Sequence, residues 1–190
     1  REIIENVISR KDEALIEYCE RFDMVKLENL IVSKEEIEDA CNRVSKEFIE
    51  VLKEAKANIE AFHKLQIKTG FEMKPSKGIT LGQKYTPIEK VGIYVPGGTA
   101  SYPSTVLMNA IPAKIAGVSL IVMTTPPQRN GKIKDEILAA AKIAGVDMII
   151  KCGGAQAIAA LAYGTESVPK VDKIVGPGNI FVAIAKRLIF

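Results

Sequence analysis

The second part of the chain alternates short apolar runs with stretches of helical periodicity, and this alternation restricts the possible fold more than any other feature. The runs that predict strands are Val91–Val95, Leu120–Thr124, Met148–Cys152 and Lys173–Val175. The predicted helices that follow them are about Pro103–Ala116, Lys132–Ala144, Ala155–Tyr163 and Ile180 to the end. Such alternation is typical of βαβ units with right-handed crossovers. We therefore expect an α/β fold, a doubly wound, Rossmann-like parallel sheet with helices on both faces.

Residues 1–83 lack this alternation. They predict a helical amino-terminal arm followed by a segment that connects it to the α/β part, and this arm is expected to belong to a domain that is completed by sequence outside these 190 residues. Apolar residues recur at three- and four-residue steps over Ile3–Phe22, which predicts a helix. Ser33 followed by Glu36 makes a capping box. From there one long amphipathic helix is predicted to run to about Leu65, and its apolar stripe needs a partner.

The stretch 69–87 is expected to connect this arm to an α/β domain of residues 84–190, because it is rich in Gly, Pro, Ser and Lys, with short β-favouring pieces. Charge also changes along the chain. Residues 1–70 hold 12 basic and 16 acidic side chains, whereas residues 71–190 hold 14 and 7. A basic second part suits a phosphate-bearing ligand such as a dinucleotide, although a solvated helix exterior would give the same count.

Composition excludes several classes of protein. No stretch approaches the roughly 18 apolar residues of a membrane span, and the first twenty residues carry charges throughout, unlike a signal peptide. Cys19, Cys41 and Cys152 are widely spaced, which indicates reduced thiols rather than a disulfide framework. No Lys/Arg run with interleaved aromatic residues suggests nucleic acid. The expected compartment is the cytoplasm.

Three of the predicted strands run directly into glycine-rich turns. These turns are Pro96-Gly97-Gly98, Gly153-Gly154 and Gly176-Pro177-Gly178. Glycine permits positive φ and close approach of a ligand, and the helix that follows each turn directs unpaired N–H groups to the same place. Since ligands of parallel sheets bind beyond the carboxyl ends of the strands, the turns predict an anion or nucleotide site, although single βα loops commonly contain glycine anyway.

Polar residues in these turns are candidate ligand contacts. Tyr94 can stack or hydrogen-bond, while Gln156 and Asn179 can both donate and accept. Each also has an ordinary interpretation, as a strand-end tyrosine or a helix cap. The Rossmann fingerprint is absent, because Phe181 stands where Gly176 and Gly178 would require a further glycine, and no P-loop is present.

The cysteines and the histidine bear on thiol and metal chemistry. Cys152, at a strand end beside a helix start, could act as a nucleophile toward an aldehyde. The single histidine, His63, is expected to be a packing residue on the long helix, so no base assists the thiol. One histidine and scattered cysteines cannot supply the three or four ligands of a zinc site.

Two long segments resemble one known family. Val91–Gly117, VGIYVPGGTASYPSTVLMNAIPAKIAG, and Gly153–Arg187, GGAQAIAALAYGTESVPKVDKIVGPGNIFVAIAKR, closely resemble the corresponding stretches of histidinol dehydrogenases. The pieces KDEALIEYCERFD, VSKEEI and ANIEAFH resemble the family less specifically. The resemblance thus covers essentially the whole chain.

The resemblance implies an aldehyde-dehydrogenase-like fold in a homodimer. It also implies oxidation of L-histidinol through L-histidinal to L-histidine, the last steps of histidine biosynthesis, with NAD as oxidant and zinc holding the substrate. By position, Tyr94, Gln156 and Asn179 match NAD-binding residues, with Pro96 and Pro177 as neighbours, and Ser104 matches a serine near the substrate pocket.

The family's zinc ligands and its Glu-His pair, the general base and acid, are expected beyond Phe190, so this chain is expected to be the NAD-facing half of the enzyme and inactive alone. Two alternatives stay open: a non-catalytic remnant acting as a binding or assembly module, and a thiol-dependent aldehyde dehydrogenase using Cys152. The sequence after Phe190 would separate the enzyme from the remnant.

Overall fold

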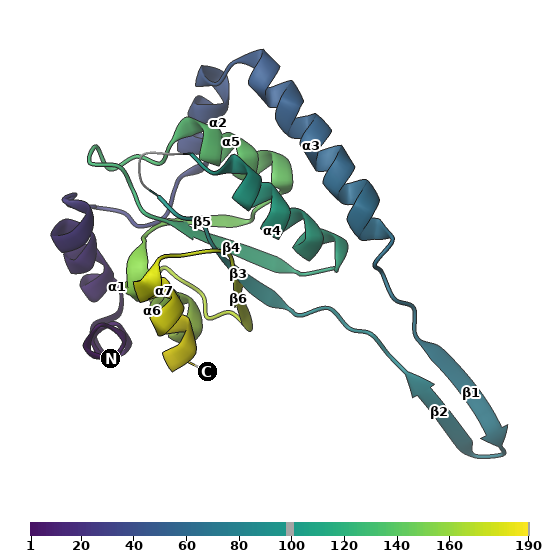
Figure 1. The fold of residues 1–190 in the computed structure, drawn as a ribbon. Helices are drawn as coiled ribbons and strands as arrows, with labels where there is room; N and C mark the ends of the chain where they lie inside the picture. Colours follow the sequence, from purple (N-terminus) through teal and green to yellow (C-terminus); the bar gives the residue numbers. More distant parts are fainter. Residues whose placement is uncertain (98–100, 190) are drawn as a thin grey trace.

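A four-stranded parallel sheet forms the centre of the molecule (Figure 1). The computed structural model describes residues 1–97 and 101–189. The strands are β3 (Lys90–Tyr94), β4 (Leu120–Thr125), β5 (Met148–Lys151) and β6 (Lys173–Val175), in the spatial order β5-β4-β3-β6. These are the strands that the apolar runs predict, and the α/β fold class is confirmed.

Helices cover both faces of this sheet (Figure 1). One face carries α4 (Pro103–Ile115) and α5 (Asp135–Ala144), and the other carries α6 (Gly154–Tyr163) and α7 (Ile180–Leu188). Because successive strand side chains point to opposite faces, Ile93 packs with the α4 and α5 core while Tyr94 packs with the α6 core. Gly92 lets α6 approach closely, since a Cβ there would lie 2.8 Å from a Leu161 methyl group.

The amino-terminal helices pack directly on this α/β unit. Helix α1 (Glu2–Asp23) is kinked at Lys11, whose φ of 51° and ψ of −124° are non-helical, and it packs against α6. Helices α2 (Lys34–Arg43) and α3 (Lys46–Lys64) pack against α5 and α4. The partner that the apolar stripe requires is therefore the outer surface of α4 and α5.

The prediction of one long helix from Ser33 to Leu65 is wrong, because the chain breaks between α2 and α3. Val44 is extended, with φ −74° and ψ 142°, and the Ser45 side chain accepts a hydrogen bond from the Phe48 N–H at 3.2 Å. Serine competes with the helical backbone for hydrogen bonds and therefore favours a cap over a helix interior. The capping box of Ser33 and Glu36 is present as predicted.

An amino-terminal segment also covers the β5 edge of the sheet. The Val32 N–H donates to the Ile149 carbonyl at 2.9 Å, and the Lys151 N–H donates to the Leu30 carbonyl at 2.7 Å. The buried Lys151 ammonium also bonds Glu36 of the capping box at 2.7 Å. These bonds satisfy the backbone groups of an otherwise open edge strand.

The connection between the helices and the sheet is a β-hairpin that projects from the body (Figure 1). Its strands are β1 (Phe71–Ser76) and β2 (Ile79–Gln83), and both are exposed along their whole length. The division into units of 1–83 and 84–190 stays a prediction. Among the helices that the structure describes, none has the length and apolar character that crossing a membrane requires.

The helix break predicts the effect of removing its cap. We expect Ser45→Ala to lower the free energy of unfolding by about 1 kcal/mol, because the first turn of α3 loses its side-chain acceptor. Urea unfolding of Ser45→Ala and of the control Ser119→Ala, an exposed serine, measures the difference. Equal stabilities of the two variants would show that the cap does not hold α3.

Candidate functional site

A cavity of about 520 Å³ lies at the carboxyl edge of the sheet. Its walls come from the ends of β3 and β4, the starts of α6 and α7, and both ends of α1. The residues that line it are Ile3, Phe22, Asp23, Tyr94, Pro96, Gly97, Pro126, Gly154, Ala155, Gln156, Asn179 and Phe181. The volume lies in the range of small-molecule sites, which is about 300–1,000 Å³. The cavity therefore lies where the glycine turns predict a ligand.

Tyr94 connects two of the turns that form this cavity. Its side chain is 4 % exposed, and its phenol oxygen accepts a hydrogen bond from the Gly154 N–H at 3.0 Å. That N–H belongs to the first turn of α6, where backbone donors have no helical partner. Burial raises the pKa of the Tyr94 phenol, so the O–H stays protonated and can donate to a ligand.

Gln156 supplies a buried amide to the same cavity. The residue is only 2 % exposed, yet its side-chain amide makes no hydrogen bond to any residue that the structure describes. Gly154 makes room for it, because φ there is +67° and a Cβ would lie 2.6 Å from the Gln156 Oε1. Neither amide atom of Gln156 is among the described buried atoms that lack a hydrogen-bond partner, so the amide is open to the cavity that the residue lines. Gln156 is therefore placed to bind a ligand.

Asn179 lines the cavity from the turn between β6 and α7. Its Oδ1 accepts a hydrogen bond from the Val182 N–H at 3.1 Å, which caps α7 and leaves the amide NH₂ group available as a donor. The preceding Gly176 has φ +102°, and a Cβ there would collide with the Tyr94 carbonyl oxygen. Glycine at this position thus lets the β6 turn lie directly against the end of β3.

The remaining predicted site residues divide into two groups. Pro96 lines the cavity beside Tyr94. Pro177 is exposed in the β6 turn and Ser104 is exposed in the first turn of α4, and neither is among the lining residues. Gly98 of the first predicted turn lies outside the described residues.

Sequence reasoning missed the contribution of α1. Phe22 and Asp23, at its carboxyl end, line the cavity although more than 70 positions separate them from Tyr94. Burial raises the pKa of the Asp23 carboxyl group to about 6. Its Oδ2 is buried without a hydrogen-bond partner among the described residues. Nothing in the local sequence indicates that this helix end lies at the sheet edge.

A second cavity of about 510 Å³ adjoins the first along the edge of the sheet. The two share Phe22, Asp23, Pro96, Gly97 and Pro126 as lining residues. The second cavity continues past the end of β4 and is also lined by Arg129 and Lys134. An elongated ligand with a negative charge could therefore extend from the polar amides toward basic side chains.

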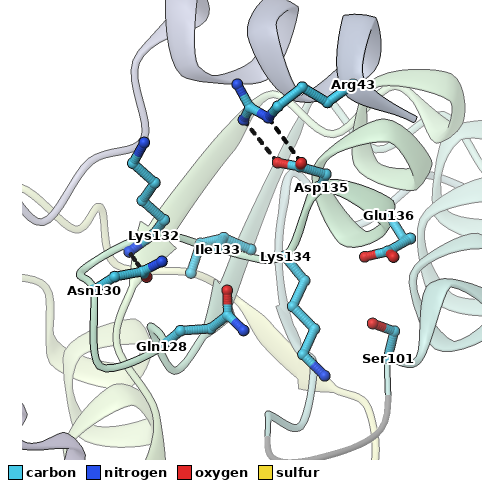
Figure 2. A pocket seen from close by; sticks show the side chains of 9 residues that line it. All are labelled: Arg43, Ser101, Gln128, Asn130, Lys132, Ile133, Lys134, Asp135 and Glu136. Atoms are coloured by element: carbon cyan, nitrogen blue, oxygen red, sulfur yellow. Dashed lines mark hydrogen bonds and ion pairs between the residues drawn. The ribbon is translucent and has the colours of Figure 1, made fainter.

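A third, polar cavity of about 640 Å³ lies at the start of α5 (Figure 2). Within it, Arg43 forms two hydrogen bonds with Asp135, at 2.7 and 2.8 Å, and the Lys132 backbone N–H donates to the Asn130 side chain. The Arg43 guanidinium holds the pKa of Asp135 below its ordinary value. Because Tyr94, Gln156 and Asn179 line the cavity at the glycine turns and none of them lines this one, we assign the candidate functional site to the cavity at the glycine turns.

Cys152 is not placed to act as a nucleophile. The thiol is fully buried and bonds the Gly153 carbonyl, and the nearby Cys19 thiol together with burial raises the pKa of Cys152 well above the ordinary value. A reactive cysteine requires an accessible thiolate. Over the described part of the chain, no group of three or more His, Cys, Asp or Glu side chains is arranged to hold a metal ion.

A parallel sheet whose carboxyl edge carries polar side chains from separate glycine turns is typical of the α/β proteins that bind nucleotides. Comparison with known families specifies the class further: the model described as "Histidinol dehydrogenase" matches residues 1–190. The chain belongs to the histidinol dehydrogenase family.

Individual relatives agree with this assignment. The chain is 59 % identical over 190 residues to a histidinol dehydrogenase of Streptococcus mutans and to one of Bacillus cereus, and covers 44 % of each. The crystal structure of histidinol dehydrogenase from Elizabethkingia anophelis superposes with a TM-score of 0.94 at 42 % identity, over 98 % of this chain and 43 % of that one. The chain thus spans about 44 % of the length of the curated relatives it matches.

The close contact at Gly176 predicts a large effect of one methyl group. We expect Gly176→Ala to lower the free energy of unfolding by about 1–3 kcal/mol more than Gly78→Ala does. Both positions have positive φ, but only at Gly176 would the added Cβ collide with another atom. Gly78, at φ +83° with open space around it, is the matched control. Thermal unfolding measures both variants, and equal losses would show that the β6 turn does not depend on this contact.

The raised pKa of Asp23 predicts pH-dependent stability. A pKa above the unfolded value means that the folded protein favours the protonated carboxyl group. The contribution of Asp23 to stability is therefore fully present below about pH 4 and is lost as the pH rises through about 6. We therefore expect Asp23→Asn to stabilise the protein at pH 8, on the order of 1 kcal/mol after discounting for solvent screening. Melting temperatures at pH 4 and pH 8 test this. A variant less stable than the parent at pH 8 would contradict it.

Proposed function

We propose that the protein containing this chain oxidises L-histidinol through L-histidinal to L-histidine with NAD, and that these residues form its NAD-facing half. One observation carries the proposal. Tyr94, Gln156 and Asn179, which match NAD-binding positions of the family, come from three separate turns and line one cavity. A single elongated ligand would require that convergence.

The donors in this cavity suit a dinucleotide. Gln156 offers an amide that is open to the cavity, Asn179 offers an NH₂ group, and Tyr94 offers a phenol O–H. Phe22, Pro96 and Pro126 add apolar walls against which a planar ring can pack. When bound, NAD would supply the hydride acceptor of the reaction. The residues of this chain would bind and orient it and exclude water.

The groups that perform the reaction are proposed to come from other parts of the protein. The family uses zinc, and the donor set of the described residues does not fit a zinc site, so we assign none of them as ligands. The Glu-His pair expected from the resemblance would likewise be supplied from sequence beyond Phe190. Ser104 and Pro177 stay predicted neighbours of the substrate and cofactor, respectively.

Asn179 allows a test that separates cofactor binding from helix capping. Asn179→Ala removes both the cap and the NH₂ donor, whereas Asn179→Ser keeps a capping oxygen and removes only the donor. We expect both variants of the full-length protein to bind NAD about tenfold more weakly by calorimetry, and only the alanine variant to lose about 1 kcal/mol of stability. Asn58→Ala, on the exposed surface of α3, is the control. Unchanged NAD affinity in Asn179→Ser would count against the proposed site.

A second copy of the chain is proposed as the partner of the β1–β2 hairpin. Phe71 and Met73 on one strand and Ile79 and Leu81 on the other share a face, and all are between 49 and 61 % exposed. An isolated two-stranded hairpin is marginally stable, so this apolar face requires a cover. Because the hairpin projects away from its own body, it can reach another protomer (Figure 1).

Two adjacent residues test this dimer. Leu81 lies on the apolar face and Thr80 on the opposite face, so we expect Leu81→Lys to shift the full-length protein from dimer to monomer in sedimentation experiments, while Thr80→Lys leaves the dimer intact. A dimeric Leu81→Lys variant with lowered stability would instead show that the protein's own chain covers this face.

A further inference from the structure

The β3-α4-β4 unit lacks one residue that dinucleotide-binding sheets ordinarily carry. In such sheets an acidic residue about 20 positions after the glycine turn, near the end of the second strand, accepts a hydrogen bond from the adenosine ribose. Here β4 continues into Thr125-Pro126-Pro127-Gln128, which contains no acid. A protein that binds NAD through this sheet must therefore recognise the ribose in another way.

The carboxylate of Asp23 lies beside this strand end. Asp23 lines the cavity at the glycine turns and also the adjoining one, which Thr125 and Pro127 line as well. Asp23 is thus a wall residue of both the cavity that the polar amides line and the cavity that extends past the end of β4. Its helix, α1, packs against α6, so a segment outside the α/β unit brings the acid to the sheet edge.

This placement is costly for the folded protein without a ligand. The Asp23 Oδ2 is buried, and no described residue donates a hydrogen bond to it. The carboxylate also lies at the carboxyl end of α1, where the helix dipole disfavours negative charge. The following Met24 has φ 56°, a strained conformation for a residue with a side chain. Strain and unsatisfied charge at one cavity wall are typical of a residue retained for binding.

We propose that Asp23 accepts a hydrogen bond from a ribose hydroxyl of the bound dinucleotide and thereby selects NAD over its 2′-phosphorylated form, NADP. The inference rests on the proposed function, because it requires the dinucleotide to occupy this cavity. A half-buried carboxylate is stabilised by a hydrogen bond from a hydroxyl group, whereas it repels a phosphate at the same place. Arg129 and Lys134 line the adjoining cavity, so removal of the carboxylate leaves a surface more favourable to phosphate.

Calorimetric titration of the full-length protein with NAD and with NADP tests this selection at pH 8. We expect Asp23→Asn to bind NAD about tenfold more weakly and to bind NADP as tightly as the parent or more tightly, so that the preference for NAD narrows at least tenfold. Glu20→Gln removes an exposed charge from the same turn of α1, outside both cavities, and should leave both affinities unchanged.

Two outcomes would overturn the proposal. If Asp23→Asn keeps the parent's ratio of NAD to NADP affinities, the carboxylate does not read the ribose. If the variant binds both dinucleotides normally but loses affinity for the amino alcohol, the carboxylate holds the substrate instead. Asn179→Ser separates these failures from a failure of the site itself. Unchanged NAD affinity in Asn179→Ser would contradict the proposed function. Weakened NAD binding in Asn179→Ser, combined with the parent's ratio of NAD to NADP affinities in Asp23→Asn, would contradict only the role proposed for Asp23.

Discussion

The hydrogen bond of 3.0 Å from the Gly154 N–H to the Tyr94 phenol is the interaction on which the arrangement of the site depends. It holds the start of α6 against the end of β3, while the missing Cβ of Gly176 lets the β6 turn lie against the same strand end. The amides of Gln156 and Asn179 are brought to one cavity because both turns are fixed to Tyr94. The glycine turns therefore act first through packing, and the ligand binding that we propose for them depends on this packing.

The sequence predicted the sheet well because parallel strands buried on both faces must be continuous apolar runs. Lys173–Val175 has the predicted bounds, β4 and β5 differ from their predictions by one residue at one end, and β3 is shifted by one residue. The long helix was predicted less well. Its apolar periodicity continues through Val44 and Ser45, so periodicity alone could not reveal that a serine cap restarts the helix there.

The site was predictable in part for the same physical reason. Tyr94, Gln156 and Asn179 follow strand ends, and the topology of a parallel sheet places strand ends on one edge. Asp23 lies on a helix whose position depends on the kink at Lys11 and on packing against α6, which are tertiary features. A position at a strand end does not by itself make a residue part of the site. Cys152 also follows a strand end, yet it is fully buried near Cys19 and does not line the cavity.

The chain combines a stable α/β frame with a few costly groups concentrated at one cavity. The half-buried Asp23, whose Oδ2 has no hydrogen-bond partner among the described residues, lines this cavity, and Met24 with its positive φ follows it directly. The central claim, that this cavity holds the dinucleotide, is tested most directly by a crystal structure of the full-length protein with NAD. We predict density for NAD in the cavity, with the Gln156 and Asn179 amides within hydrogen-bond distance of it. NAD bound elsewhere, with this cavity filled only by water, would contradict the claim.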